Sequence, residues 1–260
     1  MKRFVLGALL LCVVLTSLAF AQEAETSESA DSVVVRRAKF VFDDPVGRNI
    51  VMFKSQAPLE TVIGRTSALY GNLELNLDSL SDTPAAIFEV DLTSFETGID
   101  QRDTDMRSDV YLGTDSFPTA RIELLKVTKS NFEVLLNEAS VDLTGRAKLA
   151  FHGGVDTVNV SIKLTYFEAS EISETRLPGD IIKMNAAFDF RMSNFGIVIP
   201  EDAFLKLDDR IHVDVDAFGG TDVEPLRILT ATRTAAEPVE EMPAAEEPEA
   251  EQPEGAEGGE

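Results

Sequence analysis

The chain has very little cysteine, tryptophan or histidine. Its 260 residues include one cysteine (Cys12), no tryptophan and two histidines (His152 and His212). Cys12 lies in an apolar N-terminal segment, so the rest of the chain can form neither a disulfide nor a cysteine-based metal site. Neither histidine has a metal-ligand spacing or a serine nucleophile motif beside it. We therefore do not expect an enzyme.

The N-terminal residues 1–21 have the parts of a secretory signal peptide. Lys2 and Arg3 supply a positive start, residues 4–20 are almost all apolar, and the Ala-Phe-Ala run at 19–21 fits a small-x-small cleavage site. A retained membrane anchor is the weaker alternative, because roughly 17 residues is the short limit for crossing a bilayer. The cysteine does not follow the small residue that a lipoprotein signal requires. The sequence thus predicts a periplasmic or secreted protein with no stable membrane anchor after cleavage.

Positive charge is also scarce. The chain holds 46 Asp and Glu against 23 Lys and Arg, and its formal net charge is −23. Residues 22–32 contain four acidic and no basic residues, and residues 235–260 contain ten Glu and no Lys or Arg. We interpret 22–32 as an acidic linker and the Pro/Glu-rich 235–260 as a disordered tail, since such composition cannot bury enough apolar surface to fold. An acidic surface repels phosphates, so we expect no nucleic-acid partner.

Between these ends, residues 33–222 are dominated by strands. Apolar and polar residues alternate with a period of two in the runs 72–77, 88–92, 158–166, 184–192 and 211–217. Each run predicts a strand with one buried and one solvated face. Turn residues such as Gly71, Asn131, Thr83-Pro84 and Pro178-Gly179 separate the strands.

About eight such strands predict an all-β fold, an antiparallel eight-stranded barrel, because closure removes exposed sheet edges. An outer-membrane barrel also fits the alternation. With no Trp and three Tyr, however, the chain lacks the aromatic girdles of such barrels. A soluble barrel of this size is filled by side chains or holds one slender ligand.

The stretch 97–118, TGIDQRDTDMRSDVYLGTDSFP, holds five Asp and two Arg and is open to three interpretations. A calcium loop starting at Asp103 would place Arg107 and Ser108 where an oxygen ligand and a glycine are needed. A catalytic acid pair would need unequal burial, of which the pattern gives no sign. We favour a short helix at about 100–110 that joins two strands, with Asp100 as its cap and an exposed Asp103–Arg107 pair.

The run 88–124 resembles the YceI-like family of lipid-binding proteins. Four short motifs stand in register with the family pattern: Thr97-Gly98, Arg102-Asp103, Arg107-Ser108 and Phe117-Pro118-Thr119. The segments 44–53, 151–160 and 190–197 (FRMSNFGI) are also similar to family segments, and the resemblance covers roughly residues 36–218.

The chain departs from the family pattern at several polar positions. Arg48 and Asn49 replace His-Ser, Asp105 and Met106 replace His-Leu in the helix, and residues 154–156 replace Val-Thr-Lys. Roles that depend on those polar groups at the ligand's head do not carry over.

The resemblance implies a lipocalin-like barrel, exported to the periplasm, that holds a long isoprenoid, lipid or quinone-like amphiphile and has no catalytic residues. No other cofactor and no metal is implied. The candidate ligand-binding residues are the inward-facing apolar ones: Leu73, Leu75, Phe88, Val90, Ile122, Leu124, Val134, Phe151, Ile162, Leu164, Tyr166, Phe188, Phe190 and Val213.

The alternative function is a non-catalytic interaction module. Its barrel would be filled, and the acidic tail would bind a partner. The sequence also leaves open whether the protein forms a homodimer.

Overall fold

A computed structural model of the chain describes residues 35–82 and 84–225. The predicted signal peptide, the acidic linker, Thr83 and the tail 235–260 lie outside the described residues, so their assignments stay predictions. Among the described residues, no helix has the length and apolar character needed to cross a bilayer.

The described residues form strands joined mostly by short connections. The strands are β1 (Arg37–Phe42), β2 (Ile50–Gln56), β3 (Thr61–Thr66), β4 (Leu69–Asn76), β5 (Ala85–Asp91), β6 (Thr119–Ser130), β7 (Ser140–Phe151), β8 (Gly154–Phe167), β9 (Ile181–Arg191) and β10 (Arg210–Gly220). The helices are α1 (Asp100–Arg107) and the 3₁₀ turns η1 (Leu92–Ser94), η2 (Ser173–Thr175), η3 (Met192–Phe195) and η4 (Glu201–Ala203).

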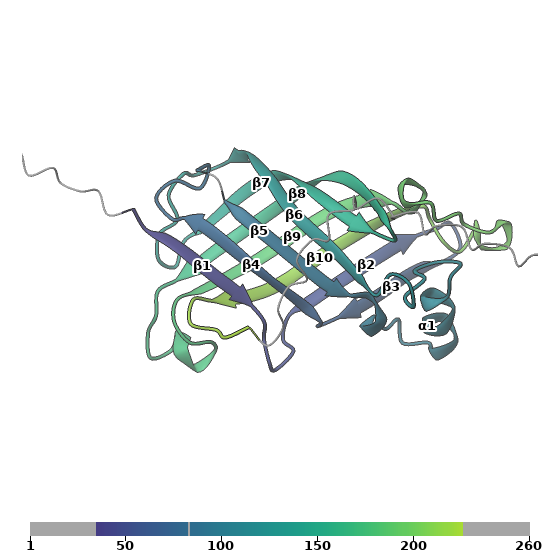
Figure 1. Cartoon of the computed structure of the whole chain (residues 1–260), viewed down its shortest axis with the longest axis horizontal. Coiled ribbons are helices and arrows are strands. Elements are labelled where there is room, and N and C mark those ends of the chain that lie inside the picture. Colours follow the sequence, from purple (N-terminus) through teal and green to yellow (C-terminus); the bar gives the residue numbers. More distant parts are fainter. Residues whose placement is uncertain (1–34, 83, 226–260) are drawn as a thin grey trace, which may run out of the picture. The chain divides into compact units, whose positions relative to one another are not determined.

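These strands close into one antiparallel barrel (Figure 1). The sheet order is β1-β4-β5-β6-β7-β8-β9-β10-β2-β3, and β1 also pairs with β10. Strands β1 and β2 therefore share one position beside β10, with register pairs Val41↔Gly220 and Val215↔Val51. Strands β3 and β4 share the next position, since β3 pairs with β2 and β4 with β1. The result is the eight-stranded closed barrel that the sequence predicts.

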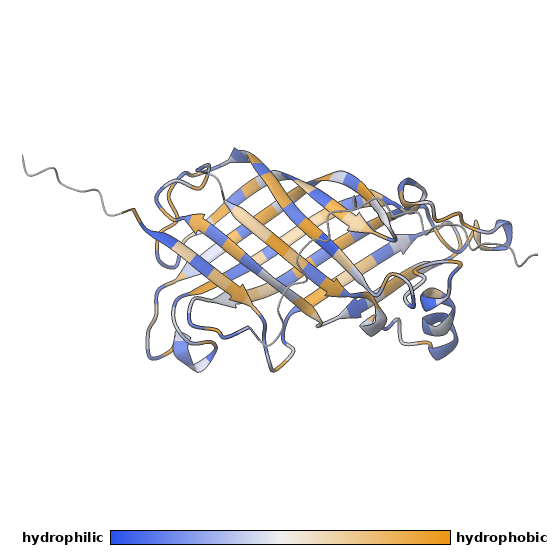
Figure 2. Cartoon of the chain, in the orientation of Figure 1, coloured by the Kyte–Doolittle hydropathy of each residue, from blue (hydrophilic) through white to orange (hydrophobic). Residues whose placement is uncertain are grey.

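Apolar side chains point inward and charged ones outward along the strands. Figure 2 shows the alternating bands. The five alternating runs lie in β4, β5, β8, β9 and β10, and those in β4, β5 and β9 extend one residue past the end of the strand. The outer face carries cross-strand ion pairs such as Lys39–Glu74 and Lys148–Glu123, at 3.0 and 3.1 Å. Burial of one face therefore fixes the register of each strand.

Gly71 is not the strand break that we predicted. It lies inside β4, opposite Phe88 of β5. A Cβ at this position would be 2.2 Å from Cδ1 of Phe88. Gly71 therefore gives the Phe88 ring space against the strand, a common reason for glycine within a sheet.

One end of the barrel is closed by two connections that we call the floor. They are residues 77–80, between β4 and β5, and residues 133–135, between β6 and β7. The N–H of Leu135 donates to the carbonyl of Leu77 (2.7 Å), and the N–H of Leu80 donates to the carbonyl of Glu133 (2.9 Å). Leu77, Leu80 and Leu135 are all at most 2% exposed. The floor is therefore a packed apolar layer.

Helix α1 lies at the opposite end of the barrel, between β5 and β6, as predicted (Figure 1). It ends at Arg107, earlier than expected, because Ser108 is extended and its hydroxyl donates to the carbonyl of Asp105 (2.6 Å). The N-cap residue is Ile99, which makes no side-chain cap bond, so the prediction that Asp100 caps the helix is wrong.

The predicted exposed Asp103–Arg107 pair is also wrong. Asp103 is 7% exposed and accepts hydrogen bonds from the backbone N–H (2.8 Å) and the hydroxyl of Thr97. Arg107 instead donates to the carbonyls of Thr93 (2.9 Å) and Phe95 (2.7 Å). Both side chains thus attach α1 to the segment before it.

We expect Asp103→Asn to weaken the protein above about pH 4 and to flatten its acid destabilisation. The Thr97 hydroxyl and, further, its backbone N–H lower the pKa of the Asp103 carboxyl below its ordinary value. Because the folded pKa is the lower one, this stabilisation is present above the unfolded pKa of about 3.9 and is lost as the pH falls through the folded pKa. Melting temperatures from pH 2 to 7 test this, with the exposed Asp109→Asn as control. Parallel curves for wild type and Asp103→Asn would contradict it.

Candidate functional site

A cavity of about 640 Å³ occupies the barrel interior between the floor and α1. Its volume lies within the range of roughly 300–1,000 Å³ that is usual for small-molecule sites. Leu80 of the floor lines one end, and Met106 of α1 lines the other. The exposed Ile99, Gln101 and Asp105 also line the α1 end, so the cavity opens there and is closed at the floor.

Several inward-facing side chains of the barrel are only half-buried. Phe188 and Phe190 of β9 and Ile122 and Leu124 of β6 all line the cavity in this state. Inward-facing side chains of a filled barrel would be close-packed. The part of each side chain that stays exposed therefore faces the empty space of the cavity.

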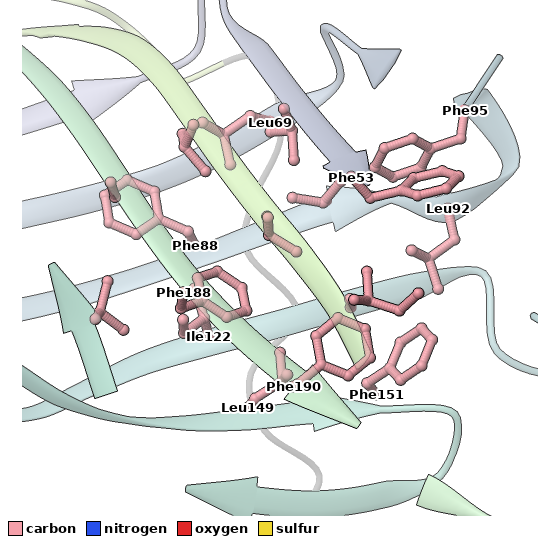
Figure 3. A pocket seen from close by; sticks show the side chains of 18 of the residues that line it. Phe53, Leu69, Phe88, Leu92, Phe95, Ile122, Leu149, Phe151, Phe188 and Phe190 are labelled. Carbon is pink, nitrogen blue, oxygen red and sulfur yellow. The ribbon is translucent and has the colours of Figure 1, made fainter. Parts of the chain in front are cut away.

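Aromatic rings from several elements form the walls near the open end (Figure 3). Phe53 of β2 packs against Phe95, with ring centroids 5.4 Å apart. Phe151 of β7 packs edge-on against Phe190, at 5.3 Å, and Phe188 lies 6.4 Å from Phe190. Such rings present large rigid apolar surfaces to whatever enters.

Most of the residues predicted to bind ligand line this one cavity. They are Leu73, Leu75, Phe88, Val90, Ile122, Leu124, Phe151, Ile162, Leu164, Phe188, Phe190 and Val213. The barrel brings them together from seven strands. Their contact with a ligand stays a prediction.

Val134 and Tyr166 do not line the cavity. Val134 is 42% exposed in the connection between β6 and β7. Tyr166 does face inward on β8, but at a depth where the barrel is filled, with its ring 6.2 Å from that of Phe40. Its hydroxyl donates to Asp180 (2.6 Å), and burial together with that carboxylate raises the pKa of Tyr166. Tyr166 is thus a structural hydrogen-bond donor.

Polar side chains gather at the open end, which we call the mouth. Its polar lining comprises Glu60, Thr97, Gln101, Arg102, Asp105, Tyr111, Asp202 and Lys206. These residues come from the β2–β3 turn, from α1 and its flanks, and from the β9–β10 connection. No sequence pattern joins segments so far apart, so the sequence analysis missed the mouth as a unit.

Arg102 connects the mouth's helix to the β2–β3 turn. Its Nη1 donates to Glu60 (2.7 Å), its Nε donates to the Thr97 hydroxyl (2.9 Å), and its Nη2 donates to the Thr97 carbonyl (3.2 Å). All three guanidinium nitrogens therefore already donate within the protein.

Burial and two nearby carboxylates disfavour the ionised form of Tyr111 in the mouth. Burial, followed by the nearby carboxylates of Asp202 and Asp105, raises the pKa of Tyr111. A phenol is protonated at neutral pH already at its ordinary pKa of about 10, so Tyr111 is a neutral hydrogen-bond donor or acceptor beside the opening.

A family model described as the YceI-like domain matches residues 35–218. The chain belongs to the YceI-like family. Two solved structures share the fold at low identity. BcnA of Burkholderia cenocepacia is 14% identical, with a TM-score of 0.52, and the match covers 68% of this chain and 99% of that one.

The second structure is a polyisoprenoid-binding domain from Saccharophagus degradans implicated in plant cell wall breakdown. It is 16% identical, with a TM-score of 0.52, and the match covers 72% of this chain and 99% of that one. No curated protein matches the sequence.

The departures from the family pattern fall in three places, and one of them, residues 154–156 at the start of β8, does not line the cavity. Arg48 pairs with Asp44 (2.7 Å) inside the β1–β2 connection, and the side-chain oxygen of Asn49 accepts the N–H of Phe218 of β10 (3.0 Å), so neither lines the cavity. Asp105, by contrast, stands in the mouth. Met106, the other departure in the helix, also lines the cavity, but only Asp105 places a carboxylate at the opening.

Proposed function

We propose that the protein is an exported carrier that holds a long isoprenoid, lipid or quinone-like amphiphile in its barrel. The observation that carries this proposal is the apolar cavity with one polar mouth and a closed floor. An amphiphile would enter tail first, so that its chain contacts the aromatic walls and its head stays at the mouth. The name of the Saccharophagus domain, a polyisoprenoid-binding domain, supports the ligand class.

Burial of apolar surface supplies the affinity in this proposal. Each Å² of apolar surface removed from water contributes about 25 cal/mol, before the costs of association. The apolar lining offers no fixed polar partner within the barrel to select a particular tail. Selection is therefore expected from tail length and width and from the head.

The two histidines, the residues that an enzyme hypothesis would rest on, lie outside the cavity. A ring nitrogen of His152 lies 3.2 Å from the Phe195 carbonyl, and the ring packs 4.7 Å from Phe117. His212 bonds with Asp189 (2.9 Å) on the outer face of β10. Neither lines the cavity.

The cavity also weighs against the alternative of a filled barrel that acts only through its tail. The export part of the proposal is supported by the signal-peptide pattern of residues 1–21.

We expect protein 22–260, purified gently from its own envelope, to carry a discrete extra mass of isoprenoid or quinone size. Native mass spectrometry with organic extraction measures it and identifies the lipid. Ala186→Trp is the matched variant, because Ala186 lines the cavity and a large ring there would occupy the ligand's space. The variant should fold and lack the extra mass. Bare wild-type protein would contradict the carrier proposal.

A further inference from the structure

The mouth holds more negative than positive charge. Its carboxylates are Glu60, Asp105 and Asp202, and its cations are Arg102 and Lys206. Arg102 is already held by Glu60 at 2.7 Å, which leaves Asp105 and Asp202 against Lys206. Among the described residues, Lys206 forms no salt bridge within 4 Å, so the lining of the opening holds one unpaired ammonium and the two carboxylates of Asp105 and Asp202.

A ligand head group at this opening would meet more carboxylate acceptors than cationic donors. Asp105 accepts a hydrogen bond from Gln101 (2.9 Å), which uses part of the capacity of one of its oxygens. Asp202 and Asp105 both act electrostatically on Tyr111, so their fields overlap there. A hydroxyl can donate to these oxygens, whereas a phosphate, with a charge of about −1.5 to −2 at neutral pH, is repelled by them.

We propose that the mouth selects amphiphiles whose head is an uncharged hydrogen-bond donor, such as an isoprenoid alcohol, and discriminates against the phosphorylated form of the same chain. This inference rests on the proposed function, since it concerns the head of a ligand whose tail fills the barrel. It assigns specificity to Asp105 and Asp202, which the resemblance to the family does not provide.

The test compares geranylgeraniol with geranylgeranyl phosphate, which share one tail. Binding of each to delipidated full-length protein is measured by displacement of a fluorescent fatty alcohol at low salt. The alcohol should bind about tenfold or more tightly, and the ratio should shrink at high salt because the mouth is exposed. Equal affinities, or tighter binding of the phosphate, would overturn the selectivity and leave the carrier proposal standing. If neither ligand binds, the carrier proposal itself fails.

The double variant Asp105→Asn/Asp202→Asn assigns the effect to the mouth. It should bring the two affinities to within about threefold of each other, by strengthening phosphate binding, because two repelling charges are removed. The matched control is Glu171→Gln/Glu174→Gln, which removes two exposed carboxylates from the β8–β9 connection at the floor end. The control should keep the wild-type ratio. An equal shift in both double variants would overturn the assignment to the mouth.

Discussion

A variant with aspartate in place of Phe188 is expected to carry no lipid. Phe188 lies in the middle of β9, paired with Val160 on one side and Val213 on the other, and its half-buried ring lines the cavity. A carboxylate at this point would lie along the path of the tail. Desolvating it costs several kcal/mol, and each 1.4 kcal/mol is tenfold in affinity. We therefore expect affinity to fall by at least about a hundredfold.

The control for this variant is Ser161→Asp. Ser161 is exposed on β8, opposite Thr144 and Ala187, so the same acid is introduced on the outer face of the sheet. Extracted lipid is quantified for both variants after circular dichroism shows that each is folded. A folded Phe188→Asp protein with a wild-type amount of lipid would show that the tail does not occupy this cavity.

Leu80→Ala is expected to destabilise the protein and to extend the range of tails that it accepts. Leu80 is 1% exposed and lines the floor end of the cavity. Truncation of such a buried leucine costs about 2–5 kcal/mol, and here it also deepens a cavity that already exists. We expect a lower denaturant midpoint and a shift of preference toward the longer of two isoprenoid alcohols.

Leu205→Ala is the control, because it truncates a leucine that does not line the cavity and so should leave tail preference unchanged. Leu205 is 55% exposed at the mouth end, so its truncation should change stability by less than about 0.5 kcal/mol. Competition between geranylgeraniol and a longer polyprenol measures tail preference. An unchanged preference in Leu80→Ala would mean that bound tails do not reach the floor.

The sequence predicted the barrel because its strands alternate with a period of two, and that period depends only on which face is buried. Ile162, Leu164 and Tyr166 share one face of β8 and were therefore treated alike. Their depth along the barrel decides their roles, and periodicity carries no information on depth. Tyr166 consequently lies in the packed part of the barrel, whereas Ile162 and Leu164 line the cavity.

Around α1, the spacing of residues within the helix did not predict the actual partners of its side chains. The spacing of Asp103 and Arg107 fits a helix-surface pair, but partners upstream in the chain, at Thr97 and Thr93, compete successfully for both side chains. Asp105 was identified as a departure from the family pattern. The fold places it in the same cavity mouth as Asp202, which comes from the distant β9–β10 connection.

Because the floor is closed, a bound tail would have to enter and leave through the mouth, end first. A tail that enters at α1 must retrace its whole length to leave, so residence time should grow with each carbon added. Each buried methylene contributes about 0.8 kcal/mol, which corresponds to roughly fourfold slower escape. A loaded barrel would thus act as a slow-release store, and an acceptor that collects cargo quickly would have to engage the α1 end and draw out the head first.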